Sequence, residues 1–272
     1  MRHVVEPDFQ ARVAEHQRTG TGAVRVPYPI GVRTVPLVAR ERLTPRMLRL
    51  TLRGADLAGF HSYQADDHVK IVFPDQDGTW RRPVPNERQK LDWPHPMPTT
   101  RDYTVRRFAE DTLVLDVVLH GHLGAGGVAS RWAETVEVGE DVTVAGPPGG
   151  KAFRYTHEHY VLAVDPTGLP AAARWLEDAP PGPGTHLVVE ADEPAEHDYP
   201  LPERAGLEVV RLVRDGTRSA LADTVRALDL PADTFLFAAG EAEDIRPLRS
   251  WPKETSSITG YWKRGVAGLE RE

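Results

Sequence analysis

Apolar and polar residues alternate along the first half of the chain, which is the pattern of strands with one buried face. The alternation is clearest over residues 47–52, and similar short apolar runs closed by turn residues occupy positions 35–38, 68–73, 101–105, 113–119 and 141–145. Six short strands separated by turn signals indicate a small antiparallel β-barrel. A helix is expected at 129–136, with Ser130 as its N-cap, and the proline-rich stretch 75–100 is expected to be a long loop.

The pattern changes after residue 155, where apolar strands begin to alternate with amphipathic helices. Strands are expected at 160–164, 186–190, 207–213 and 234–238, and helices at 169–178 and 219–228. Strands joined by helices indicate a parallel sheet with crossover connections. The sequence therefore predicts a two-domain β plus α/β protein, with an N-terminal extension over residues 1–31, a six-stranded antiparallel barrel over 32–153, and a parallel-sheet α/β domain over 154–272.

Composition and charge exclude several classes of function. The 272 residues include 33 Lys and Arg against 40 Asp and Glu, a formal net charge of −7, which disfavours general binding to nucleic acid. The absence of cysteine excludes disulfides, thiolate nucleophiles and Cys-ligated metal sites. No apolar run reaches the roughly 18–20 residues that span a bilayer, and the N-terminus lacks an apolar signal region. We expect a soluble cytoplasmic protein without an integral membrane segment or a nucleic-acid partner.

Two segments of the predicted barrel could hold a phosphorylated, flat ligand. Arg101 and Tyr103 alternate onto one face of a strand, where they could bind a phosphate and stack on a ring, or form an ordinary charged edge strand. Gly124–Ala129 fits the dinucleotide pattern G-x-G-x-x-A, but no acidic residue follows at the expected spacing. This segment indicates either a helix N-terminus that favours a phosphate or a flexible turn.

The predicted parallel sheet offers a second candidate region. Ligands of open α/β sheets bind beyond the carboxyl ends of the strands. Three segments follow strands in this way, unless they are ordinary turns: Asp165–Gly168, Glu190–Asp192 and Gly240–Glu241.

Several segments, taken in order along the chain, resemble one family. They are Leu43–Arg49, Asp66–Lys70, Arg101–Arg107, His120-Gly121 with Ala129–Ala133, Ala145–Pro147, Asp165–Pro170, Ala239–Glu241 and Gly260–Gly265. This order is similar to that of the siderophore-interacting proteins, which are FAD-dependent ferric reductases of the ferredoxin-reductase-like superfamily. The resemblance covers about residues 32–265. Its most specific parts are the Arg-x-Tyr-Thr-Val-Arg-Arg run and the terminal Gly-Tyr-Trp.

The resemblance implies that the barrel binds FAD and that the α/β domain binds the reductant. The implied FAD contacts on the barrel are Arg101, Tyr103, Thr104, Val105, Arg106, His120, Gly127, Val128, Ala129 and Ser130. The second domain would add Asp165, Thr167, Glu241, Tyr261 and Trp262, the last two covering the flavin. Lys263 and Arg264 are expected to favour the extra phosphate of NADPH, whereas Glu190 and Asp192 would suit the ribose of NADH. Reduced ferredoxin is a third possible donor.

The family implies reduction of a ferric siderophore with release of ferrous iron, by a chain that we expect to be a monomer with no metal site and no catalytic acid or base. Two alternatives stay open: a general flavin reductase or electron-transfer protein, and a non-catalytic siderophore-binding protein. Three departures from the family pattern stand out. Pro166–Gly168 replaces Glu-Thr-Ala, the glycine-rich stretch Gly124–Gly127 is long, and Ser250–Ser257 is short, which predicts a truncated helix before Gly260.

Overall fold

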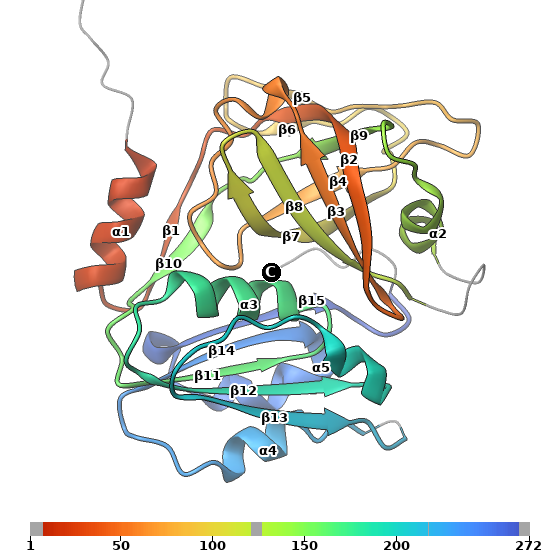
Figure 1. Cartoon of the computed structure of the whole chain (residues 1–272). Helices are drawn as coiled ribbons and strands as arrows, with labels where there is room; N and C mark the ends of the chain where they lie inside the picture. Colours follow the sequence, from red (N-terminus) through yellow and green to blue (C-terminus); the bar gives the residue numbers. More distant parts are fainter. Residues whose placement is uncertain (1–7, 121–126, 217, 267–272) are drawn as a thin grey trace, which may run out of the picture.

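The first half of the protein closes into the predicted six-stranded antiparallel barrel. We describe residues 8–120, 127–216 and 218–266 of the computed structural model. The strands follow one another around the barrel as β2 (Val32–Thr44), β3 (Met47–Arg53), β8 (Thr112–Val118), β7 (Thr100–Ala109), β4 (His68–Val72) and β9 (Asp141–Ala145). In Figure 1 they form the upper half of the molecule. This confirms the barrel that the alternating pattern predicts.

Alternation places most apolar side chains of the barrel strands inside the barrel. Leu50, Leu52, Val69, Ile71 and Leu115 are fully buried there. Helix α2 (Val128–Thr135) packs beside the barrel, close to the position expected from the sequence. The stretch 75–100 is not wholly irregular, because β5 (Val84–Pro85) and β6 (Leu91–Asp92) pair as a short hairpin. The short 3₁₀-helix η1 (Ala55–Leu57) follows β3.

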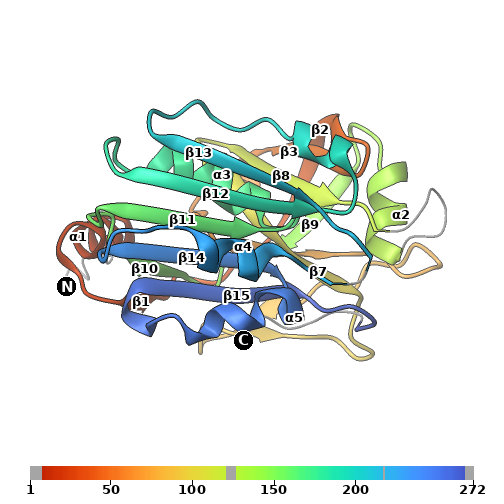
Figure 2. The ribbon, with the colours of Figure 1, turned by 90° about the horizontal axis from the view of Figure 1, so that it is seen from below.

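The second half forms a five-stranded parallel sheet in the order β13-β12-β11-β14-β15. The strands are β11 (His159–Val164), β12 (Gly184–Ala191), β13 (Leu207–Val213), β14 (Thr234–Glu241) and β15 (Ser256–Trp262). Figures 1 and 2 show helix α3 (Leu169–Asp178) between sheet and barrel, and α4 (Leu221–Ala227) and α5 (Ala242–Ile245) on the opposite face. Both faces of the central strands are covered, so β11 and β14 read as nearly continuous apolar runs.

The edge strand β15 was not expected from the sequence, which suggested only a returning segment at Gly260–Gly265. It pairs in parallel with β14, and the register shifts between Gly240 and Glu241. Before it, the chain has the four-residue α5 and the short 3₁₀-helices η3 (Arg246–Ser250) and η4 (Lys253–Thr255). The prediction that no long helix precedes Gly260 is therefore confirmed. A further 3₁₀-helix, η2 (Pro194–Asp198), follows β12.

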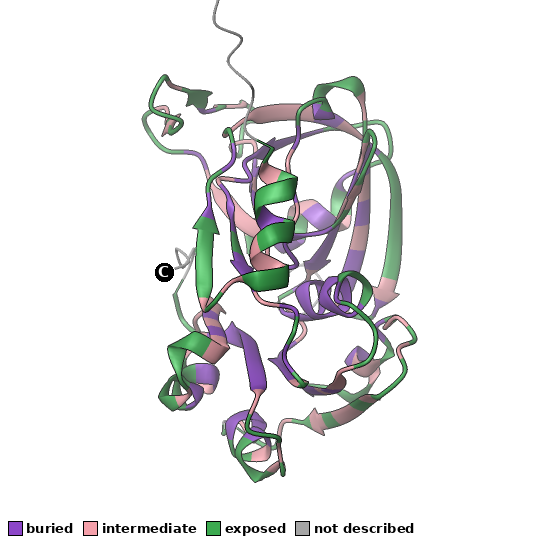
Figure 3. Cartoon of the chain, turned by 90° about the vertical axis from the view of Figure 1, so that its left-hand side faces the viewer, coloured by how far each residue is buried: buried purple, intermediate pink, exposed green. Residues whose placement is uncertain are grey.

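The N-terminal extension packs against the junction of the two halves. Helix α1 (Phe9–Thr19) leads to β1 (Ala23–Val26), which pairs antiparallel with β10 (Gly150–Phe153). Figure 3 shows that α1 exposes most of its surface and buries one side. Its buried Val13 belongs to a small apolar cluster with Val26 and Tyr28.

The barrel and the sheet are joined by polar contacts as well as apolar ones. Arg174 of α3 is buried and donates to the Ser62 hydroxyl at 2.8 Å and to the Val105 carbonyl at 2.9 Å, both on the barrel. Phe153 stacks on Trp175 of the same helix, with ring centroids 4.5 Å apart. These contacts join α3 of the α/β domain to the barrel domain. No helix in the described part of the chain has the length and apolarity required to cross a bilayer.

Candidate functional site

A small cavity lies where the carboxyl ends of the parallel strands meet the barrel. Its volume is about 130 Å³. The barrel contributes Arg46, Val118, Leu119 and His120, and the sheet contributes Asp165, Pro166, Thr167, Glu190, Asp192, Glu196, Arg214, Trp262 and Arg264. This is the place in which open α/β sheets bind their ligands. We call it the seam cavity.

Asp165, the residue directly after β11, organises the floor of the seam cavity. Its carboxylate accepts hydrogen bonds from the Thr167 amide at 2.8 Å and hydroxyl at 2.5 Å, from the Glu241 amide at 2.8 Å, and from Trp262 Nε1 at 2.7 Å. Burial raises the pKa of Asp165, and these four donors oppose the rise. Gly240 has a φ of +153°, and a Cβ there would lie 2.7 Å from the Asp165 carboxyl, so only glycine fits.

The indole of Trp262 stands between the two halves of the protein. Its ring centroid lies 5.4 Å from that of His120, at the end of β8, and the Arg264 guanidinium lies 5.3 Å from the indole centroid. The backbone amide of His120 donates to the Ser130 hydroxyl of α2 at 2.9 Å. Burial lowers the pKa of His120, which favours the neutral form of its ring. The site thus joins an indole, a neutral imidazole and a cation.

Strand β7 carries Arg101, Tyr103 and Thr104, and none of these three residues lines the seam cavity. Tyr103 packs against the barrel core, and burial raises its pKa. Arg101 donates to the Thr100 carbonyl at 2.7 Å, and no carboxylate in the described ranges pairs with it. Thr104 is only 3% exposed, and its hydroxyl has no hydrogen-bond partner in the described structure. A buried hydroxyl without a partner is costly, so this position is suited to a ligand that supplies one.

Helix α2 begins at the neighbouring edge of the barrel. Its N-cap is Gly127, and Ser130 lies inside the helix, so the expectation that Ser130 is the N-cap is wrong. Gly127 makes no side-chain cap, and the first amides of the helix, from Val128 and Ala129, face outward from its start as in any helix. The part of the glycine-rich stretch up to residue 126 lies outside the described residues.

Two residues that the resemblance assigned to FAD make contacts within the protein. Arg106 donates to both carboxylate oxygens of Glu177 on α3, at 2.7 and 2.6 Å, and to the Tyr199 hydroxyl at 3.3 Å. Val105 is fully buried in the barrel core, and its amide donates to the Asp67 carbonyl. The β7–β8 ladder has a register shift between Val105 and Arg107, so the strict alternation of side chains along the strand is interrupted at Arg106. Arg106 thereby turns towards α3.

The C-terminal residues divide between the seam cavity and the surface. Glu241 caps α5, accepting from the amides of Glu243 and Asp244 at 2.7 and 2.9 Å, so its carboxylate has a structural task. The Lys263 side chain is 42% exposed and pairs with Glu243 at 2.8 Å, outside the cavity. Arg264 lines the cavity and pairs with Asp244 at 2.8 Å. Tyr261 is half-buried against the core beside the sheet.

Two cavity residues, Arg46 and Arg214, were missed in the sequence. Arg46 lies in the turn between β2 and β3, and it reaches Asp192 at 3.8 Å. Arg214 follows β13 and pairs with Glu190 at 2.9 Å, Asp192 at 3.3 Å and Asp244 at 2.5 Å. The position of Arg214 directly after a parallel strand was a usable signal. Nothing in the local sequence links Arg46 to the other domain.

Comparison with known proteins gives the same assignment for both halves. A family model described as the siderophore-interacting FAD-binding domain matches residues 36–151, and one described as siderophore-interacting protein matches residues 157–265. A ferric vibriobactin reductase of Vibrio cholerae is 30% identical over 249 residues, covering 86% of this chain and 90% of the relative. An NADPH-dependent ferric-chelate reductase of Escherichia coli is 30% identical over 230 residues, covering 82% and 87%. The crystal structure of a siderophore utilization protein from T. fusca superimposes with a TM-score of 0.83 at 33% identity, covering 91% of this chain and 98% of that one.

Proposed function

We propose, since this chain belongs to the siderophore-interacting protein family, that it is an FAD-dependent oxidoreductase that reduces the ferric iron of a siderophore with electrons from NADPH or NADH. The observation that carries the cofactor assignment is Thr104, a buried hydroxyl without a partner beside Tyr103 and Arg101. Relatives with the names of ferric reductases, aligned over most of their length, support the reaction class.

The residues of the site fit FAD in three respects. The Tyr103 ring offers a face for the isoalloxazine, and the Thr104 hydroxyl would gain the hydrogen bond that it lacks. Arg101, unpaired with any carboxylate in the described ranges, would bind the pyrophosphate. The amides of Val128 and Ala129 at the start of α2 would share that charge. Trp262 and Tyr261 would cover the other side of the ring. We therefore propose that Arg106 and Val105 are not cofactor contacts.

Bound FAD would supply the chemistry that the reaction needs, two-electron uptake from a nicotinamide and one-electron delivery to ferric iron. The protein's own residues position the reactants and keep water away. Asp165 holds the Trp262 indole through its Nε1 and fixes the Thr167 turn, so one carboxylate positions both the cover and the floor of the seam cavity. His120 stays neutral beside the indole and adds no charge. No proton transfer by an amino acid is required.

The nicotinamide donor would enter the seam cavity. Its phosphates would meet Arg46, Arg214 and Arg264, the cations of the cavity wall. Arg214 is already paired with three carboxylates, so a phosphate would have to compete with Glu190, Asp192 and Asp244. Any preference for NADPH therefore depends on Arg264 and Arg214 and not on Lys263.

The ferrous ion formed by the reaction would leave the siderophore, because siderophore oxygens are hard ligands. They hold the smaller, more highly charged ferric ion better than the ferrous ion. Nothing in the chain has to bind the ferrous ion, and no group of three or more candidate ligands among the described residues is arranged for a metal. We further propose that the protein works in the cytoplasm as a monomer.

Two measurements test this proposal. Protein purified under native conditions should be yellow, and the supernatant after denaturation should contain FAD at about one per chain by analogy with other flavin sites. FMN, or no flavin after reconstitution with FAD, would exclude it. Anaerobic addition of NADPH or NADH should bleach the flavin absorbance, and a non-catalytic siderophore-binding protein would show neither colour nor bleaching. If only reduced ferredoxin bleaches the flavin absorbance, the assignment of NADPH or NADH as electron donor is wrong, while the assignment as a reductase stands.

A further inference from the structure

A buried network of two ion pairs and one tyrosine crosses the boundary between the barrel and the α/β domain. On the barrel, Arg49 of β3 donates to both carboxylate oxygens of Asp116 on β8, at 2.7 and 2.8 Å. From the α/β domain, the Tyr199 hydroxyl donates to the same carboxylate at 2.6 Å. It also accepts from Arg106 at 3.3 Å, and Arg106 pairs with Glu177. Tyr199 thus links two ion pairs, each of which is neutral by itself.

The bond between Tyr199 and Asp116 is shielded from water. Tyr199 is 4% exposed, and the side chain of Asp116 has no exposed surface. Burial and the neighbouring carboxylate raise the pKa of Tyr199, which favours the protonated hydroxyl that donates this bond. A hydroxyl that donates to a carboxylate over 2.6 Å forms a strong, charge-assisted hydrogen bond.

The two residues joined by this bond lead into opposite walls of the seam cavity. On the barrel side, the chain runs from Asp116 to residues 118–120, which line the cavity. On the other side, Tyr199 is the last residue of the stretch 192–199, which follows β12 and contains η2. We call this stretch the bridging segment. Two of its residues line the cavity, Asp192 and Glu196.

Arg46 makes the other contact between these two walls, and it is more exposed to solvent. It pairs with Glu193, with Glu196 at 3.5 Å and with Asp192 at 3.8 Å. The side chains of Asp192 and Glu193 are 61% and 51% exposed, so water and salt weaken their attraction to Arg46. The buried Tyr199 bond is therefore the firmer of the two contacts that set the width of the seam cavity.

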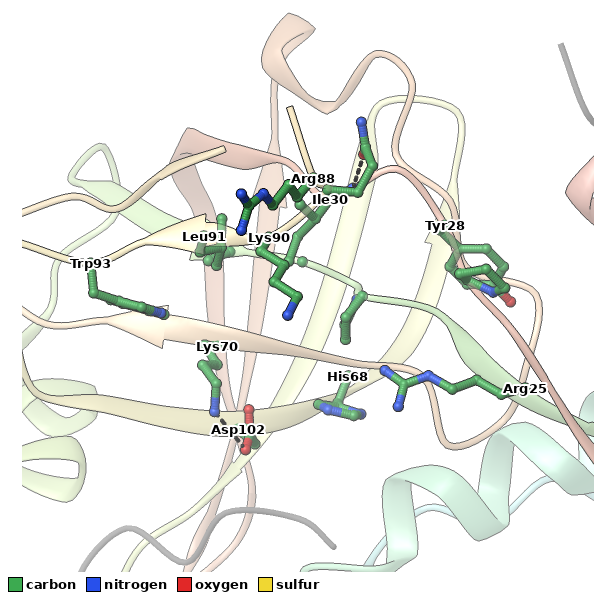
Figure 4. A pocket seen from close by; sticks show the side chains of 15 residues that line it. Arg25, Tyr28, Ile30, His68, Lys70, Arg88, Lys90, Leu91, Trp93 and Asp102 are labelled. Atoms are coloured by element: carbon green, nitrogen blue, oxygen red, sulfur yellow. Dashed lines mark hydrogen bonds and ion pairs between the residues drawn. The ribbon is translucent and has the colours of Figure 1, made fainter. Parts of the chain in front are cut away.

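The network is separate from the largest cavity of the barrel. That cavity has a volume of about 470 Å³ and opens beside β4, β7 and residues 88–93 (Figure 4). None of its lining residues belongs to the network, to the bridging segment or to the seam cavity. A change at Tyr199 should therefore act on the seam cavity and leave this part of the barrel as it is.

We propose that Tyr199 is a positioning residue, which through its bond to Asp116 fixes the gap between the walls of the seam cavity and thereby the approach of the nicotinamide donor to the flavin. The inference rests on the proposed function, in which the donor enters this cavity. A hydride passes from the nicotinamide, which is oxidised, to the flavin, which is reduced. Such a transfer needs reacting atoms about 3–3.5 Å apart, and a displacement of about 1 Å can slow it about 10²-fold.

The variant Tyr199→Phe removes the hydroxyl and keeps the ring. Asp116 retains both bonds from Arg49, and Arg106 retains its pair with Glu177. No buried charge loses its counterion, so the variant should fold.

Tyr160→Phe is the matched control. Tyr160 is fully buried in β11, and its hydroxyl accepts from the His157 amide at 3.0 Å, within the α/β domain. Each variant loses one buried tyrosine hydroxyl, but only Tyr199→Phe loses a bond between that domain and the barrel.

Three measurements on the FAD-loaded protein separate positioning from a general loosening of the fold. Anaerobic stopped-flow bleaching of the flavin over a range of NADPH concentrations gives the limiting rate constant and the apparent Kd of the donor. Charge-transfer absorbance with tetrahydro-NADPH, an analogue that cannot deliver a hydride, reports the stacking of the donor on the flavin without turnover. Bleaching by dithionite, a small reductant that needs no place in the cavity, reports on the flavin alone.

In Tyr199→Phe the limiting rate constant should fall roughly tenfold, as expected for a displacement of less than about 1 Å. The charge-transfer absorbance should decrease with it. The apparent Kd for NADPH should stay within about twofold of the wild type, since no residue that lines the cavity is changed. FAD affinity and bleaching by dithionite should not change. Tyr160→Phe should match the wild type in every one of these measurements.

Four results would overturn the inference and leave the reductase assignment intact. They are a wild-type limiting rate constant in Tyr199→Phe, weaker NADPH binding as its only defect, slower bleaching by dithionite as well as by NADPH, and an equal loss in Tyr160→Phe. By contrast, a wild-type protein that shows neither bleaching by NADPH or NADH nor charge-transfer absorbance with the analogue would refute the proposed donor, and the inference with it.

Discussion

Removing either partner of the ion pair between Arg106 and Glu177 should lower the stability of the fold, and we expect the loss to be larger when Glu177 is replaced than when Arg106 is replaced. The Arg106 side chain is 8% exposed and that of Glu177 is 40% exposed. In Glu177→Gln the buried guanidinium keeps its charge but loses its counterion, a change that costs roughly 3–5 kcal/mol for a fully buried pair. The exposure of Glu177 and the remaining Tyr199 contact reduce this cost to about 2 kcal/mol.

Arg106→Met removes the charge itself and keeps most of the aliphatic volume. Glu177 is then left half-exposed, where water can solvate it, so we expect a smaller loss of about 1 kcal/mol. For a chain of this size 1 kcal/mol corresponds to roughly 2–4 °C in Tm. Glu177→Gln should therefore melt about 4–8 °C below the wild type, and Arg106→Met about half as far.

The assay is thermal unfolding at saturating FAD, so that differences in flavin affinity do not shift the Tm. Asp223→Asn is the control, since this carboxylate of α4 is 58% exposed and its partners Arg218 and Arg226 are exposed as well. It should melt within about 1–2 °C of the wild type. Equal losses in the two interface variants, or a larger loss in Arg106→Met, would refute the burial argument. A large drop in FAD affinity of Arg106→Met would restore this arginine as a pyrophosphate ligand.

The same pair has a pH dependence of known sign. Hydrogen bonding from Arg106 lowers the pKa of Glu177. A carboxylate whose pKa is lower in the folded state stabilises that state above its unfolded pKa of about 4.3, and the contribution is lost as the pH falls through the folded pKa. The Tm difference between wild type and Glu177→Gln should be constant from about pH 7 to about pH 5 and shrink below about pH 4. A gap that persists at low pH would contradict an ionic origin.

Three further predictions concern the site. Tyr103→Ala should weaken FAD binding by about 1–3 kcal/mol in a flavin titration, through lost stacking; unchanged affinity would remove Tyr103 from the cofactor site. Asp165→Asn should slow flavin bleaching by NADPH and alter tryptophan emission, because the amide can no longer accept every bond that holds Trp262 and the turn after β11; wild-type rates would refute this positioning role. Arg264→Ala should narrow the difference in bleaching rate between NADPH and NADH, while Lys263→Ala should leave it unchanged; the reverse result would place the 2′-phosphate outside the seam cavity.

Most of the fold follows from local patterns in the sequence. Strands such as β3 bury alternate side chains, so the two-residue period of their apolar positions identifies them. Strands such as β11 are buried on both faces, so a continuous apolar run identifies them. Strand β15 escaped prediction because its residues Ser256–Trp262 are largely polar or small, as an edge strand allows. The hairpin of β5 and β6 was hidden by the prolines around it.

The site could be predicted only where one strand or one motif carries it. Arg101, Tyr103 and Thr104 are consecutive or alternate on β7, and Asp165 follows a strand, so their grouping is visible in the sequence. Arg106 belongs to the same motif, but a register shift and the partner Glu177, 71 positions away, determine its role. Arg46 lines the seam cavity only because the barrel packs against the α/β domain, and no local sequence pattern predicts that packing. The domain boundary at residues 153–154 stays a prediction.

Iron reduction in the absence of oxygen tests the central claim most directly. FAD-loaded protein is first reduced with one equivalent of NADPH per flavin and is then mixed with an excess of a ferric tris-catecholate complex and a ferrous-specific chromogenic chelator. We predict that the oxidised-flavin absorbance returns and that the ferrous chelate accumulates in the ratio of about two iron ions per flavin, as two-electron storage and one-electron delivery require. Reduced flavin that stays bleached in the presence of the ferric complex, with no ferrous chelate formed, would contradict the assignment as a ferric-siderophore reductase.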